Sequence, residues 1–152
     1  GISFGIGLSK SLSIPIYGVS SLQSIFFSHK TVSANNEHFL VAIKARGKDY
    51  FFQLFDEKSE PLVDAIKMTI LAAKEEFAGY NLFFLGDGSL DAAASFGQKE
   101  NILSYSNNID FLKVFENINE DISRYKDNVW PLYLADPVAE KKDPQWFAKK
   151  KK

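Results

Sequence analysis

Residues 1–25 read GISFGIGLSKSLSIPIYGVSSLQSI, and this stretch decides how the rest of the chain can be arranged. Pro15 ends a helix at or before the preceding residue, so the pattern predicts a helix over residues 1–13. On a helical wheel one stripe is formed by Gly1, Phe4, Gly5, Leu8 and Leu12. Ile2 and Ile6 widen the apolar arc beyond that stripe. An arc of this width predicts two contacts, one with the protein's own sheet and one with a second surface.

The next segments predict a strand, a helix and a hairpin. Residues 14–19 (IPIYGV) form a short apolar run, which is typical of a buried strand. Ser20 can cap a helix over residues 21–29. Residues 39–45 and 49–55 are rich in β-branched and aromatic side chains and are joined by a short Arg-Gly-Lys turn. This pattern predicts an antiparallel hairpin.

The segment from Leu62 to Phe77 has two interpretations. Residues 62–66 can form a strand, followed by a helix that Thr69 caps; one continuous helix from Leu62 keeps the same apolar spacing. Residues 81–85 (NLFFL) then predict a buried strand that leads into a Gly-Asp-Gly-Ser turn.

The last third of the chain predicts one long helix between weaker elements. Residues 102–103 indicate a weak strand, and residues 109–122 have the spacing of an amphipathic helix. Residues 131–134 (PLYL) suggest an edge strand, where proline is tolerated. The tail from Ala139 is charged and ends in Lys149, Lys150, Lys151 and Lys152. This order of strands and helices predicts an α/β or α+β domain.

Composition limits the class of protein. The chain has 152 residues, of which 45% are hydrophobic and 24% charged, as in a globular domain with a substantial core. A net charge of −1 argues against a general polyanion-binding surface. The absence of cysteine excludes disulfides, thiolate metal sites and cysteine nucleophiles. No signal-peptide pattern or bilayer-spanning run is present, so we expect a cytoplasmic location and no membrane association.

Few residues offer catalytic chemistry. The two histidines, His29 and His38, do not have the spacing of a helical metal pair, so we expect no metal site. The most enzyme-like feature is the turn made by Gly86, Asp87, Gly88 and Ser89, whose backbone amides could hold a phosphate at the next helix. We favour the plainer interpretation of a strand-to-helix turn, in which Asp87 or Ser89 serves as a cap.

The first 25 residues resemble the TsaB family of tRNA-modification proteins. In that family a Gly-Ser-Phe-Thr-Gly-(Leu/Val)-Arg loop precedes a glycine- and alanine-rich helix. An Ile-Pro-(Leu/Met)-(Val/Ile)-Gly-Val-Ser-(Ser/Thr)-Leu stretch follows, and here residues 14–22 read IPIYGVSSL. Residues 43–51 (IKARGKDYF) are similar to the family's Ile-Asp-Ala-Arg-x-Gly-Glu-Val-Tyr hairpin. The Gly-Asp-Gly turn and a closing Pro-x-Tyr-Leu, at residues 131–134, follow in the family's order.

The resemblance has limits. Lys44 stands where the family usually has Asp, and Ala135 where it usually has Arg. The family's opening lobe and Gly-Ser-Phe-Thr-Gly loop are not in this sequence, and we expect the chain to derive from a longer polypeptide.

The resemblance implies an actin-like ATPase architecture, a duplicated ribonuclease H-like α/β domain, with the first lobe missing from this chain. Residues 1–20 would end that first lobe, residues 21–138 would form the second lobe, and residues 139–152 would form a charged tail. It also implies a non-catalytic scaffold of the bacterial YeaZ-like type, which needs no cofactor. The scaffold would pair with TsaD and the ATPase TsaE, while TsaD transfers threonylcarbamoyl to the adenosine beside the tRNA anticodon.

The same resemblance gives the second surface of the first helix an occupant. Two helices from each partner are expected to form a four-helix bundle, and residues 1–13 match the second of them. The predicted partner interface comprises Ile2, Ser3, Ile6, Gly7 and Lys10. Ser3 and Gly7 are small enough for close helix approach, and Ile6 can act as a buried anchor. Alternatively, a different part of the sheet or the missing lobe covers Ile2 and Ile6.

Two other functions stay open. One is a nucleotide-binding or hydrolytic enzyme of actin-like fold that acts through Asp87 and its turn. The other is a free-standing homodimer formed by the same helices. Contact with tRNA would be indirect, or would use Lys149, Lys150, Lys151 and Lys152, although a charged terminus is more often simply solvated.

Overall fold

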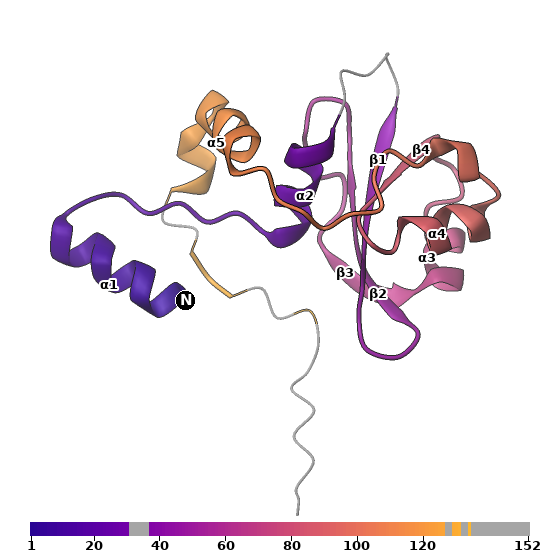
Figure 1. The fold of residues 1–152 in the computed structure, drawn as a ribbon, viewed down its shortest axis with the longest axis horizontal. Helices are drawn as coiled ribbons and strands as arrows, with labels where there is room; N and C mark the ends of the chain where they lie inside the picture. The colour runs from indigo at the N-terminus through magenta and orange to yellow at the C-terminus, as the bar shows by residue number, and fades with distance from the viewer. Residues whose placement is uncertain (31–36, 127–128, 132–133, 135–152) are drawn as a thin grey trace, which may run out of the picture.

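The computed structural model describes residues 1–30, 37–126, 129–131 and 134 (Figure 1). These residues form a mixed α/β fold. Its helices and strands are α1 (Ile2–Leu12), α2 (Ser21–His29), β1 (His38–Lys44), β2 (Asp49–Phe55), β3 (Ile66–Thr69), α3 (Ile70–Glu76), β4 (Leu82–Leu85), α4 (Ser89–Phe96) and α5 (Phe111–Glu120). Two short 3₁₀ turns, η1 (Lys99–Asn101) and η2 (Ile122–Tyr125), follow α4 and α5.

The four strands form one sheet in the order β3-β2-β1-β4. β1 and β2 are antiparallel, with Phe39 opposite Phe55, so the predicted hairpin is confirmed. Its turn includes Gly47 at φ 77°, a left-handed conformation that glycine adopts without steric cost. β4 lies parallel to β1 on the other side, and β3 is antiparallel to β2.

The sheet is covered on both faces because successive side chains of β1 point in opposite directions. Phe39 and Val41 belong to the core shared with α2 and α5, and Leu40 and Ala42 belong to the core shared with α3 and α4. Figure 1 shows the two helix pairs on opposite sides of the strands. All four of these β1 residues are at most 2% exposed, which makes β1 the centre of the molecule.

Short polar side chains fix where the helices begin. The hydroxyl of Ser20 accepts a hydrogen bond from the backbone N–H of Gln23 at 3.1 Å, and that of Thr69 accepts one from Ala72 at 3.3 Å. Both predicted caps are therefore confirmed. Asp110 caps α5, so this helix begins at Phe111, two residues later than the apolar spacing predicts.

The predicted strand over residues 14–19 is wrong. Only Tyr17 forms an isolated bridge, to Lys126, and Ile14 is 52% exposed. Pro15 has no N–H to donate, and no described strand lies beside this segment, so it runs as an extended connection.

Of the two interpretations of residues 62–77, the strand followed by a helix that Thr69 caps is confirmed with other strand bounds, and the continuous helix is wrong. No helix begins at Leu62: the chain bends there, its N–H donates to the Leu54 carbonyl at 2.9 Å, and the described helix begins at Ile70. The strand then forms at Ile66–Thr69 rather than over residues 62–66.

The weaker elements of the last third are only partly formed. The weak strand at residues 102–103 is reduced to one parallel bridge between Ile102 and Phe84. The predicted edge strand at residues 131–134 and the tail from Ala139, including its four terminal lysines, lie wholly or partly outside the described residues.

The aromatic core predicts a large cost for truncation at Phe26. This side chain is fully buried, and its ring stacks on that of Phe55 with centroids 4.5 Å apart. We expect Phe26→Ala to lower the free energy of unfolding by about 3–5 kcal/mol, measured by urea denaturation. Phe111→Ala is the matched control, because Phe111 is 77% exposed, and it should change stability by less than about 0.5 kcal/mol. Equal effects of the two substitutions would contradict the assignment of this core.

Candidate functional site

The first helix has an apolar face that the described protein leaves uncovered. Phe4, Leu8 and Leu12 lie on one side of α1 and are 71%, 42% and 61% exposed. None of the residues of α1 is buried by the described part of the chain, and Figure 1 shows the helix standing away from the sheet. The prediction that this stripe packs on the protein's own sheet is therefore wrong for the described structure. A row of large apolar side chains in water marks a surface that another partner can cover.

The flank of α1 that carries Gly5 and Ser9, next to the stripe, rests on the segment that follows the helix. A Cβ atom added to Gly5 would lie 3.2 Å from Cδ1 of Ile16, and the hydroxyl of Ser9 donates to the Ile14 carbonyl at 2.6 Å. Ser13, at φ 54°, ends the helix and turns the chain back. Because of this turn, Gly5 and Ser9 are half-buried beside their own connection.

The structure divides the predicted interface residues of α1. Ile6 is half-buried, whereas Ser3, Gly7 and Lys10 are exposed. Ile2 is 40% exposed and lines a groove described below. The arc that contains Ile6 is therefore partly covered, and its polar rim is open.

The turn after β4 is held against β1 by its own backbone. The N–H of Gly88 donates to the Ala42 carbonyl at 2.9 Å, and that of Ser89 donates to the Gly86 carbonyl at 3.1 Å. Gly86 is at φ 91°, and a Cβ there would lie 2.4 Å from the Ala42 oxygen. Glycine is required because the turn touches the strand backbone.

The third amide of the turn also has a protein acceptor. The N–H of Asp87 donates to Oδ1 of Asn107 at 2.9 Å. The carboxylate of Asp87 accepts the backbone N–H of Lys44 at 2.8 Å, and no side chain caps α4, so the predicted capping role of Asp87 or Ser89 is wrong. Since the amides of residues 87–89 all donate to protein groups, the turn is explained by its docking on β1 without a phosphate.

A charged cluster beside this turn was not predicted. The ammonium of Lys44 lies 2.9 Å from Oδ2 of Asp91, and the hydroxyl of Tyr50 donates to the same oxygen at 2.8 Å. The hydrogen bond from Lys44 has the largest effect in lowering the pKa of Asp91, and the one from Tyr50 lowers it further. The cluster ties the ends of β1 and β2 to α4. The sequence signal was Lys44 itself, which departs from the family pattern and has its partner on a distant helix.

A large groove opens on the α2 side of the sheet. It has a volume of about 1050 Å³. Its lining comes from Ile43, Phe51 and Gln53 of the sheet, from residues 17–23, from Pro61, Asp64 and Ala65, and from Arg124, Tyr125, Val129, Trp130, Pro131 and Leu134. Ile2 of α1 also lines it. The groove is assembled from five separate parts of the sequence, so no local sequence pattern predicts it.

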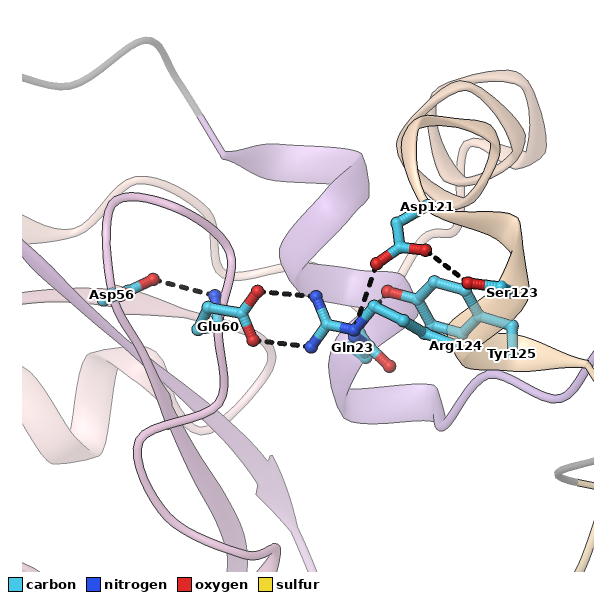
Figure 2. A network of polar contacts seen from close by, with 7 residues as sticks. All are labelled: Gln23, Asp56, Glu60, Asp121, Ser123, Arg124 and Tyr125. Atoms are coloured by element: carbon cyan, nitrogen blue, oxygen red, sulfur yellow. Dashed lines mark hydrogen bonds and ion pairs between the residues drawn. The ribbon is translucent and has the colours of Figure 1, made fainter.

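A polar network fixes one rim of the groove (Figure 2). The guanidinium of Arg124 donates to both carboxylate oxygens of Glu60 at 2.5 Å, and the backbone N–H of Glu60 donates to Asp56 at 2.7 Å. Beside it, the amide of Gln23 donates to the hydroxyl of Tyr125 at 3.1 Å, and burial raises the pKa of Tyr125. The network joins the loop between β2 and β3 to η2 and to α2.

The segment between α1 and α2 lies beside the chain at the end of η2. The N–H of Gly18 donates to the carbonyl of Tyr125 at 3.0 Å, next to the bridge between Tyr17 and Lys126. The segment after α1 is thereby anchored to the domain, although α1 itself is not.

Other candidate chemistry is sparse. The ring of His29 bonds through Nε2 to the Asn108 carbonyl at 2.9 Å. The described residues hold no cluster of three or more histidine or carboxylate side chains that could bind a metal ion. Among the helices that the structure describes, none is long and apolar enough to cross a bilayer.

With this geometry in view, comparison with solved structures gives a clear likeness of fold. The chain superposes on a crystal structure of an uncharacterized protein from Pseudomonas aeruginosa with similarity to peptidase YEAZ, with a TM-score of 0.67. The two share a fold. Their sequences are 17% identical, and the superposition covers 88% of this chain but only 65% of that one. No family model and no curated protein matches the sequence.

The docked turn predicts a structural role for Asp87 and no nucleotide site. We expect Asp87→Ala to lower the free energy of unfolding by about 1 kcal/mol, because the N–H of Lys44 loses its acceptor. Mg-ATP should leave the melting temperature of the parent and of the variant unchanged. Glu75→Ala, at an exposed position of α3, is the control and should be neutral. A rise in melting temperature with Mg-ATP that Asp87→Ala abolishes would show that the turn binds nucleotide.

Proposed function

We propose that this chain is a TsaB-type scaffold protein. Two lines support the proposal: the sequence blocks at residues 1–25 and 43–51, and the fold shared with a structure described as similar to YEAZ. In this proposal the sheet and its two helix layers are the second, ribonuclease H-like lobe of an actin-like ATPase fold. The protein acts in the cytoplasm, catalyses nothing itself, and supports a TsaD homologue that forms threonylcarbamoyladenosine on tRNA, together with a TsaE homologue.

The observation that carries this proposal is the uncovered state of α1. An isolated helix of 11 residues is marginal in water, so α1 needs tertiary packing that the described chain does not give it. The stripe of Phe4, Leu8 and Leu12 and the arc of Ile2 and Ile6 lie on different sides of the helix. Two apolar surfaces on one helix fit a place inside a bundle, where neighbours pack on more than one side.

The partner is proposed to approach the arc of Ile6. Ser3 and Gly7 are exposed and small, so a helix of the TsaD homologue can come close to the α1 backbone there. Ile6 would complete its burial in this contact, and Lys10 would lie at the polar edge. The stripe of Phe4, Leu8 and Leu12 would then be left for a second apolar surface.

Two charge substitutions on opposite faces of α1 test this assignment. Ile6→Asp should weaken pairing with the TsaD homologue by about 3 kcal/mol, or about 100-fold in Kd, because a carboxylate would be stranded in a dry contact. Leu8→Asp, with the same change in charge on the other face, should leave that Kd within about threefold, since surface changes away from a contact are small. The measurement is titration calorimetry on the full gene product, with folding checked by thermal melting.

The pattern of results is decisive. If Leu8→Asp and not Ile6→Asp prevents pairing, the face assignment is reversed. If both variants bind like the parent, α1 is not the partner surface.

A homodimer is the second candidate, because the same uncovered helix can pair with a second copy. Sedimentation of the protein alone distinguishes the two: the scaffold proposal predicts that adding the TsaD homologue displaces any self-association. A dimer that persists in the presence of the TsaD homologue would favour the free-standing dimer.

A further inference from the structure

The sheet has one edge that the described chain leaves open. β3 pairs with β2 on one side, and no described strand lies on its other side. An open edge presents backbone N–H and C=O groups that an extended segment can pair with. At the opposite edge of the sheet, β4 is partly covered, because Phe84 forms a parallel bridge with Ile102. The two edges therefore differ, and only that of β3 is free among the described residues.

An apolar hollow of about 210 Å³ adjoins the open edge. Its apolar lining comes from the loop before β3, from β3 and from the end of α3, namely Val63, Ala65, Ile66, Met68 and Phe77. Ile66 is 43% exposed, so part of this apolar lining is open to solvent. Its size and lining suit one large apolar side chain.

Two carboxylates give the rim of this hollow a negative charge. Asp64 and Glu76 line it, and both are exposed. Neither takes part in the ion pairs formed among the described residues. A segment that carries an apolar side chain between positive charges would complement both the hollow and its rim.

We propose that residues 139–152 of this same chain dock on the β3 edge. This segment reads AEKKDPQWFAKKKK, with six lysines and two carboxylates, a net charge of +4. Its only large apolar residues are Trp146 and Phe147, and lysines lie on both sides of them. In the proposed complex the segment extends along β3, one aromatic ring enters the hollow, and lysines face Asp64 and Glu76.

The length of the chain permits this docking. Leu134 lines the large groove, and Asp64 and Ala65 line both that groove and the small hollow. Trp146 follows Leu134 by 12 residues, which reach up to about 40 Å when extended. Because the segment is tethered, its effective concentration at the edge is high and a weak contact is enough to hold it. The proposal does not depend on the TsaB assignment.

Tryptophan fluorescence tests the proposal directly. The chain has two tryptophans, and Trp130 is 80% exposed, so Trp130→Phe is well tolerated and leaves Trp146 as the only reporter. In this background we expect acrylamide to quench Trp146 several-fold less than it quenches a peptide of residues 139–152. The double substitution Asp64→Lys and Glu76→Lys should restore strong quenching, because like charges then repel the segment. Added salt should raise quenching in the parent, since salt screens exposed ion pairs.

A matched control and dilution complete the test. Glu116→Lys changes the charge on the exposed face of α5, on the other side of the sheet, and should leave the quenching of Trp146 as low as in the parent. Thermal melting confirms that each variant is folded. Quenching equal to that of the peptide, or insensitive to the double substitution, would overturn the proposal. If the protection of Trp146 disappears on dilution, the segment of a second copy lies on this edge. If the protection needs the TsaD homologue, a partner lies there. Either result rejects docking within one chain.

Discussion

The arrangement depends on one constraint, the burial of β1 from every direction. β1 is paired with β2 on one edge and β4 on the other, and its side chains alternate between two cores. The strand cannot shift its register by one residue without exchanging the sides of both cores. Elements far apart in the sequence are positioned by reference to it: the turn after β4 docks on the Ala42 carbonyl, and the carboxylate of Asp87 accepts the N–H of Lys44.

The burial of β1 also separates the elements that are packed around it from the surfaces that can contact other chains. Around β1, apolar burial and backbone hydrogen bonds fix α2, α3, α4 and α5. The turn at residues 86–89, the most enzyme-like feature of the sequence, directs its backbone amides at residues 87–89 to protein acceptors in that packing. Among the described residues, exposed apolar surface remains at the periphery, on α1 and on α5 (Phe111, Leu112 and Phe115), and the edge of β3 has open backbone groups. A molecule whose uncommitted chemistry is apolar surface and open backbone is suited to contact other chains, and this agrees with the scaffold function that we propose.

Sequence reasoning succeeded where the deciding contacts are local. The hairpin follows from two β-rich runs on either side of Gly47, and β4 from an unbroken apolar run. The caps follow from a hydroxyl at the start of a helical pattern, with Ser20 two residues before Leu22 and Thr69 directly before Ile70. It failed where a distant partner decides. The N–H of Leu62 donates to the carbonyl of Leu54, residues 14–19 lack a neighbouring described strand, and the groove combines parts that are far apart in sequence. For α1, the wheel predicted two contact surfaces, but the one assigned to the chain's own sheet is uncovered in the described structure.

The central claim is that α1 is an interaction helix that becomes ordered by a partner, and hydrogen exchange tests it most directly. Elements without tertiary packing open at little cost in free energy, whereas central strands open only with global unfolding. We expect the amides of α1 in the isolated protein to exchange far faster than those of β1, and to slow by about tenfold or more when the TsaD homologue is added. Protection of α1 equal to that of β1 in the isolated protein, or no change on adding the partner, would contradict the account.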